Sequence, residues 1–230
     1  YYFEKTPHLF SEVRGNWFDI MGLSIGPVVE YLNQHSKVTV FQAPKIAAVL
    51  GHPVAHSKSP RMHGHWLETN RISGSYIAID IPLCRFSETV RVLIGVGIIG
   101  FNVTLPYKED ALALADYLTP RAKAIGAANT LIIDLNGLIT ADNTDGYGFI
   151  TNLKVNSSDW FPQTGPALVL GAGGASRAVL VSLIEAGCPK IYLTNRTFQR
   201  AKDLAFQLSP LIEVIDWEDK ERYLPIVTTV

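Results

Sequence analysis

The stretch Ala167-Leu168-Val169-Leu170-Gly171-Ala172-Gly173-Gly174-Ala175-Ser176-Arg177 decides the fold of this chain. Its apolar first part predicts a buried strand, and the glycines that follow predict a tight turn. An apolar stretch with helical character continues to Ala186, and a second apolar strand is predicted at 190–194. A strand, a glycine turn, a helix and a strand in this order are typical of a Rossmann-type dinucleotide-binding fold.

The glycines of this turn predict contact with a nucleotide. Gly171 permits the tight turn, while Gly173 and Gly174 let the backbone approach a pyrophosphate at the N-terminus of the helix. Ser176 stands where the usual GxGxxG pattern has its last glycine, so the match is imperfect. A structural turn without a ligand is the alternative, but the strands and the helix around the turn favour a nucleotide.

The end of the second strand predicts which nucleotide is bound. NAD sites usually carry Asp or Glu there for the ribose 2′-hydroxyl. This chain has Asn195, Arg196 and Thr197 instead, with Arg200 one turn further on. Guanidinium groups hold a 2′-phosphate through charge-assisted hydrogen bonds, whereas a carboxylate would repel it. The sequence therefore predicts NADP, and a solvated basic helix start is the alternative.

Length and charge restrict the remaining classes of protein. A chain of 230 residues is long for one core, so two domains are expected. The net charge of −1 gives no overall positive field, and nucleic acid and membrane surfaces are not expected partners. No apolar run reaches the ~20 residues of a membrane span. The cysteines, Cys84 and Cys188, lack metal-site spacing, so the sequence predicts no metal, reduced thiols and a cytoplasmic location.

The part of the chain before residue 155 alternates between strand and helix patterns. This alternation predicts an α/β fold with a mostly parallel sheet, followed by a hairpin at 128–141 around Asn136-Gly137. The expected division is a 1–43 extension of unknown role, a substrate-binding catalytic domain at 44–145 and a Rossmann-type domain at 146–230. The polar, proline-containing stretch 155–166 is the loop expected near the boundary. Expected strands lie at 46–50, 75–81, 98–103 and 225–230, and expected helices at 59–69, 86–94 and 148–154.

Two segments of the first part carry polar groups from strand ends into turns, where open α/β sheets place ligands. After the first strand, Ser59 is a suitable N-cap and Pro60 a suitable first helical residue. Ser57, Ser59 and the free helix amides can hold an anionic group, or the serines only cap and turn. After the strand at 98–103, the chain carries Asn102, Thr104 and then Lys108 at the start of a helix. Without further motifs, Lys108 would be interpreted as a solvated lysine at the start of a helix.

The ordered motifs resemble the shikimate dehydrogenase family. The resemblance covers about residues 45–230 and implies NADP-dependent interconversion of 3-dehydroshikimate and shikimate in aromatic amino-acid biosynthesis. It implies Lys108 and Asp145 as the catalytic pair, and which of the two is the base stays open. The matching stretches are 51–63, 102–108, 126–130, 143–146, 171–175 and 195–200.

The same resemblance implies the binding residues. The substrate would be held by Ser57, Ser59, Asn102, Thr104 and Asn129. The cofactor would contact the glycine loop and the basic segment after the second strand. These cofactor residues are Gly171, Ala172, Gly173, Gly174, Ala175, Asn195, Arg196, Thr197 and Arg200.

Several alternatives remain open at this point. The family normally continues beyond the apolar stretch 225–230, so an incomplete nucleotide domain and weak or no turnover are expected for this chain alone. The rivals are a quinate/shikimate dehydrogenase that uses NAD or NADP, a non-catalytic ligand-binding relative, and an inactive fragment. A homodimer is also left open. Residues 13–23 resemble the tail of the Maf-type nucleotide pyrophosphatases, or form a loosely packed extension.

Overall fold

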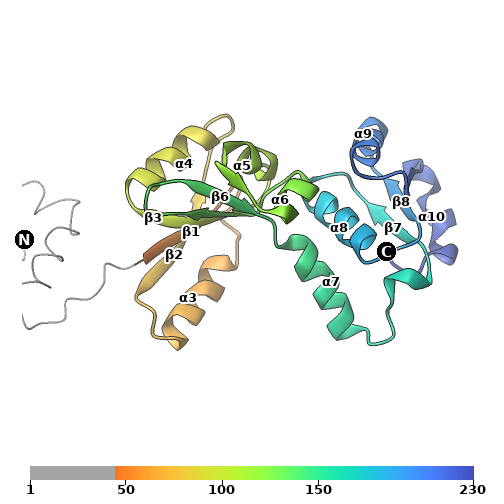
Figure 1. Ribbon diagram of the computed structural model, residues 1–230, viewed down its shortest axis with the longest axis horizontal. Coiled ribbons are helices and arrows are strands. Elements are labelled where there is room, and N and C mark those ends of the chain that lie inside the picture. The colour runs from red at the N-terminus through yellow and green to blue at the C-terminus, as the bar shows by residue number, and fades with distance from the viewer. Residues whose placement is uncertain (1–44) are drawn as a thin grey trace, which may run out of the picture.

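The computed structural model describes residues 45–230 as two lobes, each built around its own β-sheet (Figure 1). Residues 1–44 lie outside the described part, and with them the 1–43 extension and the Maf-like segment 13–23. None of the helices between residues 45 and 230 combines the length and the apolar character that a membrane span requires.

The first lobe contains a mixed six-stranded sheet with the order β2-β1-β3-β5-β6-β4. Strand β1 runs parallel to β2 and β3, and β4 runs parallel to β6, whereas β5 is antiparallel to both β3 and β6. The predicted hairpin is confirmed as the β5–β6 pair. The strands are β1 Lys45–Gly51, β2 Gly74–Asp80, β3 Ile98–Val103, β4 Tyr117–Leu118, β5 Thr130–Ile133 and β6 Ile139–Asp142.

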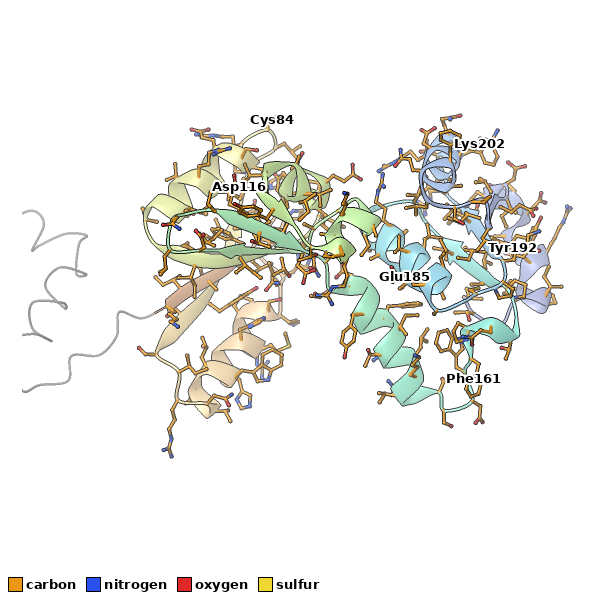
Figure 2. All side chains as sticks on the ribbon, in the orientation of Figure 1. Cys84, Asp116, Phe161, Glu185, Tyr192 and Lys202 are labelled. Carbon is orange, nitrogen blue, oxygen red and sulfur yellow. The ribbon has the colours of Figure 1, made fainter. Side chains whose placement is uncertain are left out.

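Helices cover the two faces of this sheet unequally. Helix α3 lies on one side, while α4 and α5 lie on the other (Figure 1). The main core of this lobe includes Leu50, Phe101 and Leu131, which are almost completely buried. Asp116, marked in Figure 2, accepts a hydrogen bond from the Ile139 amide and fixes the edge beside β6. The helices are α3 Ser59–Thr69, α4 Phe86–Gly95, α5 Lys108–Leu114 and α6 Pro120–Ile125.

The second lobe has a parallel three-stranded sheet with the order β7-β8-β9. Helices α8 and α9 supply Leu180, Leu183 and Leu204 to the core on one face. On the opposite face, the ring of Tyr192 (Figure 2) lies 4.5 Å from the ring of Tyr223 in α10. The elements are β7 Ala167–Leu170, α8 Gly174–Glu185, β8 Ile191–Thr194, α9 Phe198–Leu208, β9 Ile212–Val214 and α10 Lys220–Tyr223.

Helix α7 (Asp145–Asn156) leads from the first sheet to the second lobe and packs against α8. A glycine makes the close approach of the two helices feasible. A Cβ atom on Gly146 would lie 2.9 Å from the Ala178 carbonyl oxygen and 3.2 Å from the Ser182 Cβ. Any larger residue at position 146 would therefore push α8, and the glycine loop before it, away from the first lobe.

The structure corrects three local predictions. Helix α3 already includes Ser59, so Lys58 is the N-cap residue, and the Ser57 hydroxyl accepts the Ser59 amide instead. Helix α7 begins at Asp145 rather than at 148, and it extends to Asn156, into the predicted loop 155–166. The predicted strand 225–230 is wrong. Leu224–Ile226 form a 3₁₀ turn, and only Thr229 makes a parallel bridge, to Ala167.

Two leucines of the β5 hairpin test the description of the core. Leu131 is 1% exposed and Leu135 in the turn is 106% exposed. Leu131→Ala should lower the free energy of unfolding by about 2–5 kcal/mol because it leaves a cavity. Leu135→Ala should change it by less than about 0.5 kcal/mol. Urea denaturation of both variants measures the difference, and equal losses would contradict the assigned burial.

Candidate active site

Lys108 and Asp145 form an ion pair at the junction of the two lobes. The Lys108 Nζ donates to the Asp145 Oδ2 across 2.5 Å. Lys108 is the first residue of α5, which follows β3, and Asp145 is the first residue of α7, which follows β6. The two side chains are 12% and 31% exposed, so the pair is shielded from bulk water but remains accessible to a ligand. The predicted catalytic pair is therefore in direct contact.

Asn129 holds the other oxygen of the same carboxylate. Its Nδ2 donates to the Asp145 Oδ1 across 2.8 Å, and its Oδ1 accepts the Thr144 amide across 3.0 Å. The Thr130 hydroxyl also donates to that Oδ1, across 2.9 Å. Because both amide ends of Asn129 are engaged, the orientation of the side chain is fixed. The Asp145 carboxylate is thus held from two sides, by Lys108 and by Asn129.

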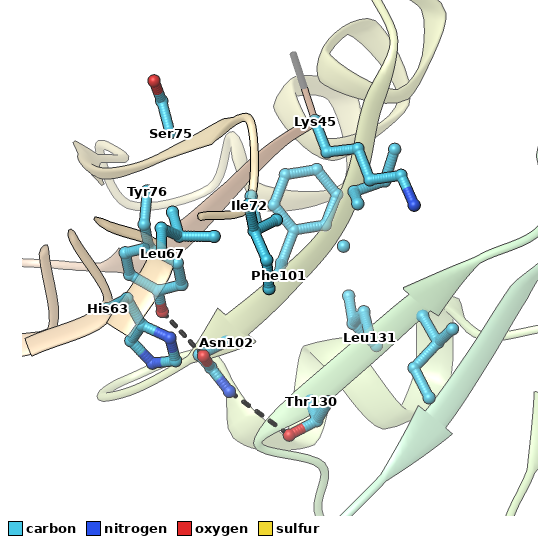
Figure 3. Close-up of a pocket in the computed structure, with 14 residues that line it drawn as sticks. Lys45, His63, Leu67, Ile72, Ser75, Tyr76, Phe101, Asn102, Thr130 and Leu131 are labelled. Atoms are coloured by element: carbon cyan, nitrogen blue, oxygen red, sulfur yellow. Dashed lines mark hydrogen bonds between the residues drawn. The ribbon is translucent and has the colours of Figure 1, made fainter. Parts of the chain in front are cut away.

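Asn102 extends this network along the strand ends. Its Nδ2 donates to the Thr130 hydroxyl across 3.3 Å, and its Oδ1 accepts the Tyr76 hydroxyl across 2.6 Å (Figure 3). Burial raises the pKa of Tyr76 to about 12, so this phenol remains a hydrogen-bond donor at neutral pH. The ring of His63 stacks on that of Tyr76 at 4.0 Å. These side chains line one end of a mostly apolar cavity of about 370 Å³, which Lys45 and Ser75 also line.

Tyr76 and Thr130 were not predicted as site residues. Tyr76 sits in the middle of β2, where alternation indicates only a strand, and Thr130 begins β5. Their contacts with Asn102 arise from the sheet order, which brings segments 26 and 28 residues apart to one edge. No local signal in the sequence would have identified Tyr76, whereas Thr130 is the last residue of the matching stretch 126–130.

The remaining predicted substrate residues lie on the loops after β1 and β3. These loops are joined, because the His52 amide donates to the Leu105 carbonyl across 2.9 Å. Thr104 packs against Gly51, where any Cβ atom would lie 2.5 Å from the threonine methyl group. Ser57 and Ser59 stand at the start of α3 on this edge, and no side-chain contact joins them to Lys108 or Asp145 among the described hydrogen bonds. The structure therefore joins the two loops that carry these residues.

A second carboxylate, Asp142, anchors the turn that presents Asp145. It accepts hydrogen bonds from the Thr119 hydroxyl at 2.6 Å and from the Arg121 guanidinium at 2.5 Å. Burial alone would raise the pKa of Asp142, but these hydrogen bonds outweigh that effect and lower it. The buried Asn143 completes the turn, since its Oδ1 accepts the Asp145 amide across 3.0 Å. The start of α7 is therefore rigidly attached to α6 and β6.

The glycine loop joins β7 to α8 with a geometry that fits an anion. Gly171 has a φ of +113°, which side chains rarely tolerate, and the N-cap of α8 is Gly173, which has no side chain to cap the helix amides. The Ala172 amide is taken by the Asn195 Oδ1 at 3.2 Å. The first-turn amides of α8 therefore remain as donors for a phosphate group.

Asn195 joins the two segments predicted to contact the cofactor. Besides accepting the Ala172 amide, it donates through Nδ2 to the Thr197 carbonyl across 2.9 Å. Its amide thus has a structural task within the loop. Arg196, Thr197 and Arg200 are exposed beyond the end of β8. Among residues 45–230, no group of three His, Cys, Asp or Glu side chains is arranged to hold a metal ion.

The two halves of the site meet at Gly174. A Cβ atom on this glycine would lie 3.3 Å from the Lys108 Cβ and 3.4 Å from its Cδ. Arg177, one turn further along α8, reaches Glu109 beside the lysine at 3.5 Å. The first turn of the predicted nucleotide-binding helix therefore packs directly against the stem of Lys108.

Comparisons with known proteins match both lobes of this chain. Residues 49–131 match the model of the shikimate dehydrogenase substrate binding domain, and residues 160–228 match that of shikimate / quinate 5-dehydrogenase. A shikimate dehydrogenase (NADP(+)) from Roseobacter denitrificans is 52% identical over 172 residues, which are 75% of this chain and 62% of the relative. The crystal structure of shikimate dehydrogenase from Aquifex aeolicus is 34% identical, with a TM-score of 0.73, over 81% of this chain and 68% of that one. The chain belongs to the shikimate dehydrogenase family.

A shikimate 5-dehydrogenase from Thermus thermophilus, solved in complex with NADP(H) and shikimate, is also similar. It is 44% identical with a TM-score of 0.67, over 76% of this chain and 64% of that one. The chain thus spans less than two thirds of several shikimate dehydrogenases that it matches, including 62% of the Roseobacter relative. The two family matches contain Lys108 and the glycine loop respectively, while Asp145 lies between them.

The Asp142 anchor predicts a pH-dependent stability. Since the pKa of Asp142 is lower in the folded than in the unfolded chain, its ionised form stabilises the fold at neutral pH, and this stabilisation is lost as the pH falls through the folded-state value. Asp142→Asn should cost about 1.5–3 kcal/mol at pH 7.

The difference between wild type and Asp142→Asn should narrow as the pH falls below about 4. Chemical denaturation across that range measures it, with the exposed Asp159→Asn as the matched control. A difference that stays constant with pH would contradict the anchor.

Proposed function

We propose that this chain carries the substrate-binding and NADP-binding parts of a shikimate dehydrogenase, which interconverts 3-dehydroshikimate and shikimate. The carrying observation is the Lys108–Asp145 pair packed against Gly174 of the predicted nucleotide loop. The relatives named shikimate dehydrogenase (NADP(+)) and the Thermus complex with NADP(H) and shikimate support the proposal. Aromatic amino-acid biosynthesis is the pathway that this activity implies.

In this proposal residues 44–145 form the substrate-binding catalytic domain and residues 146–230 the NADP-binding domain. The proposed substrate loops are the segments after β1 and β3 and the connection between α6 and β5. The proposed cofactor loops are the segments after β7 and β8. Ligands of α/β folds bind at the carboxyl ends of parallel strands, and both sets of loops include such ends.

Lys108 and Asp145 act as the general acid–base pair of the proposed reaction. NADP⁺, when bound, would accept the hydride from the carbon that bears the substrate hydroxyl group, and the hydroxyl oxygen would give its proton to the Lys108–Asp145 pair. The Lys108 Nζ donates a hydrogen bond to the Asp145 carboxylate, so the pair can accept the substrate proton on the carboxylate, or on the amine once the amine has passed its own proton to the carboxylate. In the reverse direction the same pair returns the proton to the carbonyl oxygen. Positioned acid–base groups contribute about 10²–10⁴-fold to turnover.

The polar groups around the pair suit a hydroxylated carboxylic acid. Asn102 and Asn129 each have an amide held by neighbouring side chains, so their donors are ordered before a ligand arrives. Thr104 and the serines Ser57 and Ser59 complete the proposed set on the adjoining loops. The cytoplasmic location of this protein and its assembly as a homodimer stay predictions.

A substitution of Lys108 tests the proposed catalytic pair. Lys108→Ala should reduce the kcat of shikimate oxidation at least about 100-fold, because it removes one member of the proposed proton-transfer pair. The exposed Lys154→Ala serves as the control and should retain the turnover of the unsubstituted chain. NADPH formation with shikimate measures both variants.

A Lys108→Ala variant with nearly unchanged kcat would exclude the proposed role of the lysine. A wild-type chain that binds shikimate without oxidising it would support the non-catalytic relative or the inactive fragment.

A substitution of Arg196 tests the proposed preference for NADP⁺ over NAD⁺. Arg196→Ala should reduce the ratio of kcat/KM for NADP⁺ over NAD⁺ about tenfold or more, because the 2′-phosphate loses charge-assisted hydrogen bonds. Arg91→Ala, an exposed arginine in α4 of the other lobe, should leave the ratio unchanged. An unchanged ratio in Arg196→Ala would show that another group selects the cofactor.

A further inference from the structure

A tryptophan lies beside the basic segment after β8. Strands β8 and β9 are parallel neighbours with Leu193 paired to Val214, so the segments that follow them emerge at the same edge of the sheet. The β8 segment carries Arg196, and the β9 segment leads through Asp216 to Trp217. The glycine loop leaves the sheet at the same edge, because it follows β7, which is parallel to β8. Ligands of parallel sheets bind along such an edge.

Trp217 contacts two cations at once. The guanidinium carbon of Arg196 lies 5.7 Å from the indole centroid, and the Lys220 Nζ lies 4.8 Å from it. Lys220 is fixed in addition by a hydrogen bond of 3.1 Å to the Trp217 carbonyl oxygen. Tryptophan is the best aromatic partner for a cation within about 6 Å of its ring. The nearby carboxylate of Asp219 pairs with Arg222 at 2.9 Å.

We propose that Trp217 is a positioning residue that determines cofactor specificity by holding Arg196 ready for the 2′-phosphate of NADP. The inference rests on the proposed function and goes beyond it, because Trp217 and Lys220 belong to no sequence motif of the site. Arg196 is exposed, and without the indole its long side chain would have to be ordered when the phosphate binds. The half-buried indole removes part of that cost, and Lys220 adds a second positive charge on the same ring.

Equilibrium binding of two fragments of the cofactor tests this role. 2′,5′-ADP carries the 2′-phosphate and 5′-AMP lacks it, so their affinity ratio reports on the phosphate alone. Trp217→Leu should weaken 2′,5′-ADP about fivefold, with little change for 5′-AMP. Trp217→Phe keeps an aromatic face and should restore most of the affinity. Trp66→Leu in the first lobe is the matched control, since Trp66 is half-exposed and remote from the nucleotide loops.

A double-mutant cycle with Arg196→Ala separates positioning from packing. Once Arg196 is absent, Trp217→Leu should have no further effect on 2′,5′-ADP. Additive losses, equal losses for both fragments, or no loss at all would overturn the inference. If Trp217→Leu fails to fold in a thermal melt, Trp217→Met takes its place in the same cycle. A wild-type chain that does not prefer 2′,5′-ADP to 5′-AMP would instead contradict the proposed NADP site.

Discussion

The ion pair between Lys108 and Asp145 is the contact on which the architecture of this site depends. The lysine follows β3 and the aspartate follows β6, and these strands are not neighbours, because β5 lies between them. Asn129, immediately before β5, fills the gap and binds the second oxygen of the carboxylate. Three strand ends therefore converge on one carboxylate. Removing one partner would leave a partly buried charge without compensation, which is costly in proteins.

The second constraint is the close approach of the two lobes. Gly146 lets α7 lie against α8, and Gly174 lets the first turn of α8 lie against the stem of Lys108. A pyrophosphate at the α8 N-terminus would thus be bound next to the lysine that the other lobe positions. Small residues at these two places bring the predicted nucleotide loop and the lysine of the proposed catalytic pair together. The Arg177–Glu109 contact at 3.5 Å acts in the same region of the interface.

The sequence predicted those features that depend on local patterns. The alternation of strands and helices, the β5–β6 hairpin and the glycine turn at Gly171 follow from periodicity and turn chemistry. The prediction that Lys108 and Asp145 form a pair came from the family resemblance. The contacts of Tyr76 with Asn102 and of Gly174 with Lys108 could not be predicted, because both are set by packing between distant segments. The prediction of a strand at 225–230 was wrong because Leu224–Ile226 form a 3₁₀ turn, which leaves only Thr229 in a bridge to Ala167, and apolar character alone does not distinguish a turn from a strand.

The most direct test of the account is a steady-state comparison of the chain with shikimate or quinate and with NADP⁺ or NAD⁺, in all combinations. The formation of reduced nicotinamide is followed and kcat/KM is compared. The account predicts the highest value for shikimate with NADP⁺, because the polar strand ends around Lys108 and the arginine beyond β8 would select that combination. A higher value with quinate than with shikimate, or with NAD⁺ than with NADP⁺, would contradict it.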